Sequence, residues 1–256
     1  MTQSEKTDQF AALHVPGTPL ILFNIWDAGS AAAVARSGAK AIATGSWGVA
    51  GAHGIGDGEK LPLDTAISTL SEIVAITDLP VTIDMEAGYG ADASGVGVSI
   101  KRAVDAGAVG INLEDKDPVT RALFSIETQS ARIAAAAAAT GIFVNARTDV
   151  FILTPPAEHD AALVDAVVER AKAYADVGAR GLFVPFLQDA ALIERLCAAS
   201  PLPVNILIRP GCPDHKALAA LGVARISHGH GPWAAAMAAL EDQARAALIA
   251  AFVGSL

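Results

Sequence analysis

The sequence predicts a (β/α)8 barrel, and three observations lead to this fold class. Short apolar runs rich in β-branched residues recur along the chain, and Ala-rich stretches of helical pattern, such as SAAAVARSG and DAVVERAKAYADVG, separate most of them. Strands that alternate with helices predict a parallel sheet. We count eight such strands in 256 residues, which fits one closed barrel. A doubly wound open sheet is the alternative.

The eight strands can be placed in order because most of them follow a recurring local signal. Glycine precedes four runs, in SGAKAIATGS, AGAVGINLED, VGARGLFVPF and LGVARISHGH, and Leu-Pro precedes two, in TDLPVTIDME and PLPVNILIRP. Glycine suits the end of a helix, and a continuous apolar run suits a strand buried on both faces. We therefore predict strands at residues 20–27, 40–46, 80–86, 109–115, 141–148, 180–186, 203–209 and 223–229. No linker or composition shift divides the chain, so residues 1–256 are expected to form a single barrel domain.

The composition argues against several classes of function. The net charge is −9 and no cluster of Lys and Arg stands out, so nucleic acid and anionic membranes are poor partners. The mean hydropathy is +0.42, but no apolar run reaches the ~18 residues of a spanning helix. The polar start MTQSEKTDQF lacks an apolar signal core, and the two cysteines, Cys197 and Cys212, form no framework. We expect a cytoplasmic protein.

Polar and charged residues gather where the predicted strands end. In chain order these ends are WDAGS, TGSWG, DMEAGYG, NLEDK, NARTD, VPFLQ, IRPG and SHGHG, whereas the strand starts are apolar or small. Active sites of (β/α)8 barrels lie at the carboxyl ends of the strands, so this asymmetry locates the candidate site. In WDAGS, Asp27 is equally compatible with a site and with a structural role beside Ser30, the expected helix N-cap.

Two carboxylates end the third strand, in VTIDMEAGYG. Asp84 and Glu86 share one side of the strand because side chains alternate, and Met85 takes the other. A like-charged pair at ~4 Å costs roughly 4 kcal/mol at an effective dielectric of about 20, so a proton, an arginine or a cation must offset it. Glu114 reaches the same rim from the next strand. Three oxygen ligands favour Mg²⁺ or Mn²⁺, while helix capping or pairing with Lys or Arg is the alternative. The GYG that follows is interpreted as a turn by which the loop leaves the barrel.

DMEAGYG followed by GAVGINLEDK, with GSWG before and NARTD after, resembles the isocitrate lyase/phosphoenolpyruvate mutase superfamily, and the likeness runs from FNIWDAGSA to GVARISHGHGPWAAAM. The resemblance implies a (β/α)8 barrel whose last helix, here PWAAAMAALEDQARAALIAAFVG, is exchanged between subunits of a homodimer or homotetramer. It also implies Mg²⁺ and a small 2-oxo acid or enolpyruvyl substrate whose C–C or P–C bond is made or broken.

The resemblance assigns the acidic residues to the metal. It makes Asp84 a metal ligand that also lies beside the substrate, places Glu86 near the metal through water, and adds Glu114 to the acidic set. Asp57, in GIGDGEK, resembles an acid that reaches the water shell of the metal. Lys116, in LEDK, corresponds to a catalytic lysine of the superfamily.

Anchors for the substrate follow from its expected chemistry. GSWG supplies the Ser46 hydroxyl and the amides of Trp47 and Gly48 at a strand end that opens a loop, and the superfamily uses this element to hold a carboxylate or oxyanion. A turn in which Ser46 caps its own backbone is the alternative.

Three further residues are candidates for substrate contact. The resemblance implies that Arg147 binds the transferable or distal group of the substrate. The alternative is that Arg147 forms a salt bridge to Asp149 or to the acidic cluster. Asn145 shares the face of Arg147. His230 ends the eighth strand and is a candidate for a distal carboxylate, with a structural hydrogen bond equally compatible.

The chain departs from the superfamily after LEDK and after the sixth strand. LEDKDPVTRALFSIE contains no Cys where isocitrate and methylisocitrate lyases carry K-[KR]-C-G-H, so we exclude those two activities. The loop is also shorter than in enzymes that process phosphonopyruvate, and Thr120 and Arg121 are loose substitutes for their polar residues. VPFLQ places Pro185 and Phe186 where mutases have a His and lyases a Glu.

We therefore predict a Mg²⁺-dependent lyase that cleaves a C–C bond of an oxaloacetate-like 2-oxo acid, or decarboxylates it, through a metal-bound enolate. A phosphoenolpyruvate phosphonomutase or phosphonopyruvate hydrolase is the alternative enzyme. An oxo-acid-binding barrel without turnover is the alternative outside catalysis.

Overall fold

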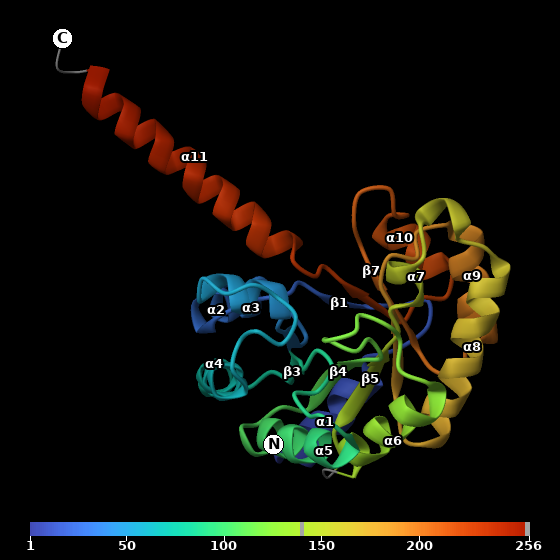
Figure 1. The fold of residues 1–256 in the computed structure, drawn as a ribbon. Helices are drawn as coiled ribbons and strands as arrows, with labels where there is room; N and C mark the ends of the chain where they lie inside the picture. Colours follow the sequence, from blue (N-terminus) through green and yellow to red (C-terminus); the bar gives the residue numbers. More distant parts are fainter. Residues whose placement is uncertain (139–140, 254–256) are drawn as a thin grey trace.

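Eight parallel strands, with helices between them, form a nearly closed barrel (Figure 1). The structure is a computed structural model that describes residues 1–138 and 141–253. The strands are β1 (Leu20–Leu22), β2 (Ile42–Ala43), β3 (Val81–Asp84), β4 (Gly110–Glu114), β5 (Phe143–Arg147), β6 (Gly181–Val184), β7 (Val204–Leu207) and β8 (Arg225–Ser227). Each lies inside one of the predicted ranges, so the barrel prediction is confirmed.

The strand order leaves β1 and β2 at the two ends of the sheet. Neighbours run β1-β8-β7-β6-β5-β4-β3-β2, and all of these pairs are parallel. Beyond the ends of β1 and β2, a parallel bridge joins Ile25 to Thr44. The Ile25 amide donates to the Ala43 carbonyl at 2.9 Å, and the Gly45 amide donates to the Ile25 carbonyl at 3.1 Å. This contact favours the barrel over an open sheet.

The helices surround the barrel. They are α1 (Gln3–Ala12), α2 (Ala28–Arg36), α3 (Ser46–Ala52), α4 (Leu63–Ala75), α5 (Ala93–Asp105), α6 (Ile126–Ala137), α7 (Val150–Leu153), α8 (Ala161–Asp176), α9 (Ala190–Ala199), α10 (His215–Ala220) and α11 (Gly231–Val253), with a short 3₁₀ turn, η1 (Pro156–Glu158). The N-cap of α2 is Asp27, and Ser30, which we expected to cap, is the third helical residue. The Asp27 carboxylate accepts the Ser30 amide at 2.7 Å. Asp27 is therefore structural.

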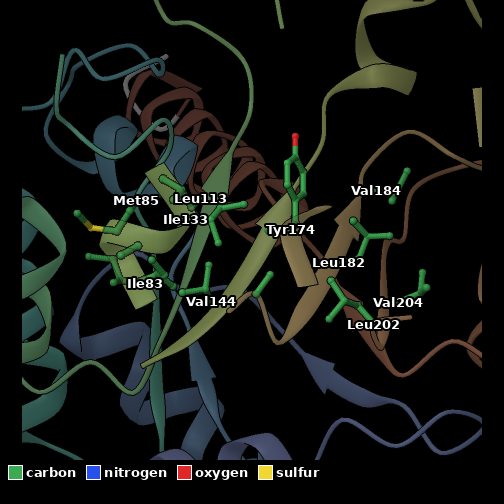
Figure 2. Packing of buried hydrophobic residues seen from close by; sticks show 14 of the residues in the cluster. Ile83, Met85, Leu113, Ile133, Val144, Tyr174, Leu182, Val184, Leu202 and Val204 are labelled. Carbon is green, nitrogen blue, oxygen red and sulfur yellow. The ribbon is translucent and has the colours of Figure 1, made fainter. Parts of the chain in front are cut away.

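The hydrophobic core lies between the strands and the surrounding helices (Figure 2). Ile83 and Met85 are both buried in it, with Leu113 and Val144 from the next strands. Side chains alternate along a strand. Ile83 and Met85 point outward into this core, so Asp84 between them points into the interior of the barrel. The predicted separation of Met85 from the two acids is thus confirmed.

Helix α11 extends away from the barrel (Figure 1). Leu240, Leu248 and Ile249 on it are 60%, 64% and 57% exposed. Beside β1 the barrel carries an apolar groove of about 760 Å³, whose lining includes the half-exposed Ile21 and Phe23. Gly254, the last residue of the predicted helix, lies outside the described residues. Within residues 1–138 and 141–253, no helix combines the length and the apolar character required to cross a bilayer.

Candidate active site

A cavity of about 400 Å³ collects most of the predicted site residues at the carboxyl ends of the strands. Its lining includes six of them, Trp47, Asp57, Glu86, Glu114, Lys116 and Arg147. Arg121 and Trp233 also line this cavity. A narrower pocket shares Glu86 with it and contains Asp84 and Ser46.

Asp84 and Glu86 are held by backbone amides of neighbouring segments. Asp84, at the end of β3, accepts the Ser46 amide at 3.4 Å. Glu86 takes a positive φ of 49° and accepts the Glu59 amide at 2.6 Å and the Tyr89 hydroxyl at 3.1 Å. A left-handed conformation is costly for a side chain such as Glu, so these contacts fix the carboxylate in one direction.

The turn after Glu86 follows the sequence prediction. Gly88 has a φ of +101°, and an added Cβ on Gly90 would lie 2.3 Å from the Val96 amide nitrogen at the start of α5. Only glycine fits at this second position. The GYG segment therefore turns the chain out of the barrel, as predicted.

Burial and mutual repulsion favour protons on these acids. Burial raises the pKa of Asp84 above its ordinary value, against the opposing charge of Arg147. Burial, followed by the charges of Asp57 and Asp84, raises the pKa of Glu86 to about 8. Burial also raises the pKa of Glu114 to about 7, although Arg147 and Lys116 oppose this. Burial is the largest cause of the raised pKa for all three acids, and clustered carboxylates with raised pKa values are typical of functional sites.

Glu114 belongs to a buried ion network. Its carboxylate lies 2.8 Å from Arg147 Nη1 and 3.3 Å from Lys116 Nζ. Asp149 accepts Arg147 Nε at 2.6 Å and Nη2 at 3.0 Å, and it also contacts Lys116. Burial alone would lower the pKa of Arg147, but Glu114 and Asp149 raise it above its ordinary value. The salt-bridge interpretation of Arg147 therefore describes its contacts, and a role toward the substrate stays a prediction.

A second buried group supports the loop that carries Asp149. Asp115 accepts the Asp149 amide at 2.9 Å, the Tyr174 hydroxyl at 3.0 Å and Arg170 Nη1 at 3.2 Å. Both Asp115 and Tyr174 are fully buried. Helix α8, which carries Arg170 and Tyr174, thus fixes the backbone that presents Asp149 to Arg147.

GSWG forms the first turn of helix α3, where we expected a loop. Gly45 is the N-cap and makes no side-chain bond, so the helix begins on Ser46. The amides of the first helical turn have no intrahelical acceptor. Ser46 donates its amide to Asp84, which leaves the Trp47 and Gly48 amides in the same turn. A helix start presents these donors more rigidly than a loop and suits an anionic group.

Trp233, at the start of α11, packs on the back of α3. Its ring atoms lie 2.7–3.0 Å from an ideal Cβ built on Gly51, and its own Cβ lies 3.3 Å from one built on Gly48. The close approach requires glycine at Gly51. The sequence offered no signal for this contact, which joins two segments nearly 200 residues apart.

The acidic residues offer the oxygen ligands that a hard cation prefers. Asp84 and Glu86 form no ion pair with Lys, Arg or His in the part of the chain that the structure describes, and both have raised pKa values. No three Asp, Glu, His or Cys side chains there form a closed ligand cluster. Mg²⁺ uses one or two carboxylates and keeps several waters. The residues present therefore fit an ion held directly by Asp84 and through water by its neighbours.

Two predicted substrate residues lie apart from this cavity. Asn145 is fully buried in the barrel interior, where its Nδ2 donates to Asn112 at 2.9 Å and to Asn205 at 3.2 Å. His230 is exposed on the rim, with its ring 5.2 Å from that of Trp47. Arg225, also in the interior, donates to Asn112 at 3.2 Å. The interior of this barrel thus carries a polar layer beneath the site.

Sequence reasoning missed several residues that shape the site. Glu59 accepts the Tyr89 amide at 2.8 Å and donates its own amide to Glu86, so it joins the loop before α4 to the turn after β3. Asp149 was named only as an alternative partner for Arg147. Its position two residues after Arg147 was a usable signal, because a strand end followed by an acid places both at one rim.

Comparisons with known proteins place the chain among related sequences along most of its length. The sequence model of the family described as phosphoenolpyruvate phosphomutase matches residues 10–248. A crystal structure from Burkholderia cenocepacia J2315, of a protein named after the phosphonomutases, is 48% identical with a TM-score of 0.94, covering 96% of this chain and 100% of that one.

Two curated relatives have names that specify a reaction. The 2-methylisocitrate lyase of Escherichia coli strain K12 is 31% identical over 215 residues, 75% of this chain and 70% of the relative. An oxaloacetate decarboxylase of Rhodopseudomonas palustris strain BisB18 is 32% identical over 202 residues, 72% of this chain and 67% of the relative. The similar proteins thus differ in the reaction that their names specify.

Proposed function

Because the chain belongs to the phosphoenolpyruvate phosphomutase family, in the isocitrate lyase/phosphoenolpyruvate mutase superfamily, we propose that it is a lyase acting on an oxaloacetate-like 2-oxo acid. One observation supports this most directly: the surplus of buried carboxylate charge at Asp84 and Glu86 lies beside the first turn of α3. A cation and an oxo acid can meet at that point, with the acids on one side and free amides on the other.

The acids would hold Mg²⁺ or Mn²⁺, with Asp84 as the direct ligand and Glu86, Glu114 and Asp57 in reach through water. When bound, such an ion supplies Lewis-acid stabilisation for negative charge on the 2-oxo oxygen. Glu114 keeps its orientation through Arg147 and Lys116. These two cations limit the repulsion that a fully ionised acidic set would create.

Helix α3 orients the other end of the reacting group. The Ser46 hydroxyl and the Trp47 and Gly48 amides donate to the carboxylate next to the 2-oxo carbon. In oxaloacetate the bond between C3 and C4 then breaks, CO2 leaves, and the electron pair forms the enolate of pyruvate. A proton added at C3 completes the reaction.

That proton comes from water or from a group that the sequence does not identify. No Cys or His stands between Lys116 and Glu127, so the hairpin over the site carries no acid of the lyase type. A positioned acid contributes ~10²–10⁴-fold to a rate, so modest turnover is expected.

Phosphonopyruvate chemistry is the second candidate, and the 48% identity to the Burkholderia protein named after the phosphonomutases favours it. The residues after β6 weaken this candidate, because Pro185 and Phe186 stand where mutases have a His. They equally weaken isocitrate-type binding, because lyases have a Glu there.

One screen separates the candidates. Purified protein with Mg²⁺ is incubated with oxaloacetate, with substituted malates and with phosphonopyruvate, and pyruvate and phosphate are measured. Enzyme-dependent pyruvate from oxaloacetate, above the metal-catalysed background, supports the proposal. Phosphate from phosphonopyruvate supports the second candidate. Tight oxalate binding without turnover of any compound supports a binding barrel.

The proposal includes assembly of several copies. Helix α11 leaves its own barrel with Leu240 and Leu248 exposed, while the groove beside β1 exposes Ile21 and Phe23. Apolar area of this kind is usually covered. We propose that α11 occupies this groove on a neighbouring subunit in a homodimer or homotetramer. A monomer mass in light scattering at micromolar concentration would contradict it.

A further inference from the structure

Three cations line the active-site cavity, and two of them are already paired. Lys116 contacts Asp149 and Glu114, and Arg147 uses all three nitrogens of its guanidinium on the same two carboxylates. Breaking either pairing would leave a buried carboxylate without its partner, which is costly. The third cation in the lining, Arg121, can bind a second anionic group without that cost.

Arg121 is not held by carboxylates in this way in the part of the chain that the structure describes. Its side chain lines the cavity, and it forms no ion pair with a carboxylate of residues 1–138 or 141–253. An added Cβ on Gly58 would lie 3.8 Å from Arg121 Nη1. The guanidinium therefore reaches across the cavity mouth to the loop that carries Asp57.

A tight hairpin sets the position of Arg121. Lys116 and Leu123 form an antiparallel bridge, and the Asp117 amide donates to the Ala122 carbonyl at 2.9 Å. The Arg121 amide donates to the Asp117 carbonyl at 2.9 Å. Arg121 itself has a φ of +63°. A non-glycine residue in this region of φ marks a place where the surrounding structure fixes the backbone, and such places concentrate at ligand sites.

The Asp117 side chain closes the turn from inside. Its Oδ1 accepts the Val119 amide at 2.8 Å and the Thr120 amide at 3.2 Å. The acid nearest to Arg121 in the hairpin is thus occupied by backbone donors. The shortened loop is a preformed hairpin with one unpaired guanidinium at the cavity.

We propose that Arg121 is the specificity-determining residue that binds the distal carboxylate of a dicarboxylate substrate. This inference rests on the proposed function, because it takes the 2-oxo acid end to lie at α3 and the acidic cluster. A guanidinium fork pairs with a carboxylate through two parallel hydrogen bonds. The site therefore selects 2-oxo acids that carry a second carboxylate over 2-oxo acids of the same length that end in a methyl group.

The test compares ligands with and without a distal carboxylate. Binding of 3,3-difluorooxaloacetate, of 2-oxobutanoate and of oxalate is measured by calorimetry with saturating Mg²⁺ on wild type and on Arg121→Met. We expect the variant to lose about 10- to 100-fold in affinity for the dicarboxylate, the range of a charged hydrogen bond. Affinity for oxalate and 2-oxobutanoate should change less than about twofold, because neither reaches Arg121.

Two further variants serve as controls. Arg195→Met removes an exposed arginine that pairs with Asp165 between α8 and α9, so it changes the net charge equally without touching the cavity. It should leave all three affinities unchanged. Arg121→Lys keeps the charge without the fork and should recover part of the dicarboxylate affinity. Equal losses for all three ligands in Arg121→Met, or an unchanged preference for the dicarboxylate, would overturn the role of Arg121.

Turnover is measured separately on the wild type. A protein that prefers the dicarboxylate through Arg121 and yet forms no pyruvate from oxaloacetate supports this inference and contradicts the proposed reaction. Formation of pyruvate with the preference unchanged in Arg121→Met contradicts this inference alone.

Discussion

Glu86 illustrates at the scale of one residue how the site constrains the backbone. Its φ of +49° costs about 1–3 kcal/mol for a side chain of this type. The Glu59 amide and the Tyr89 hydroxyl hold its two oxygens. The strain is offset by these bonds and brings a second carboxylate beside Asp84. Position in the strand predicted that both acids share a side, but the positive φ has no signal in the sequence.

The first prediction concerns Asp84. Asp84→Ala should abolish tight Mg²⁺ binding and leave a folded barrel, because the change removes a ligand and also relieves repulsion with Glu86. Calorimetric titration with Mg²⁺ measures it. Asp64→Ala is the matched control, since Asp64 is an exposed acid that pairs with Arg102 on the outer helices. Equal Mg²⁺ affinity in Asp84→Ala and in wild type would remove Asp84 from the ligand set.

The second prediction concerns pH. The folded pKa values of Glu86 and Glu114 are about 8 and about 7, above the ordinary 4.5. Without metal, these groups take up protons on folding between about pH 4.5 and 8, so they stabilise the fold below that window and lose this effect as pH rises through it. Mg²⁺ must displace the protons. Its affinity should rise from pH 6 to pH 8.5.

Calorimetry in two buffers of different ionisation enthalpy at pH 7 would count the protons that Mg²⁺ releases. Release of protons supports the assignment of the acids. An affinity that does not change across this pH range would show that Glu86 and Glu114 are already ionised or lie outside the reach of the ion.

At the scale of elements, the strands and the turn after β3 were predictable, whereas several other connections at the rim were not. An apolar run buried on both faces has few alternatives, so all eight strands fall inside the predicted ranges. GSWG begins a helix because Gly45 ends the strand and the following residues continue in helical geometry, whereas the motif alone fits a loop equally well. The hairpin of Lys116 to Leu123 and the pairing of Arg147 depend on contacts between segments, which no local pattern contains.

The third prediction concerns helix α8. Tyr174→Phe removes the hydroxyl that donates to Asp115 at 3.0 Å and accepts from Arg170 at 2.9 Å. Asp115 would stay buried with one donor fewer, so the free energy of unfolding should fall by about 1–2 kcal/mol. Urea denaturation measures the change. Tyr89→Phe is the comparison, because the Tyr89 hydroxyl serves Glu86 in the cavity. It should change Mg²⁺ binding more than Tyr174→Phe does.

At the scale of the whole molecule, helix α11 and the apolar groove beside β1 are two apolar surfaces that one chain leaves uncovered. The fourth prediction tests their pairing. Leu240→Glu with Leu248→Glu should convert the assembly to monomers, because both side chains are exposed on α11 in one copy and a charge cannot enter an apolar groove cheaply. Sedimentation velocity measures the mass. Two exposed acidic substitutions on α9, Ala191→Glu with Glu194→Asp, should leave the mass unchanged.

Trp233 gives the proposed assembly a second consequence. Its ring lies against Gly51 of α3, the helix proposed to bind the substrate, and Trp233 also lies in the first turn of α11. Docking of α11 on a neighbour and ordering of α3 around a ligand would then be thermodynamically linked, and such linkage is reciprocal. Activity per subunit should therefore decline on dilution below the dissociation constant of the assembly. Oxalate binding should strengthen the association of subunits. Association of subunits should strengthen oxalate binding by the same factor.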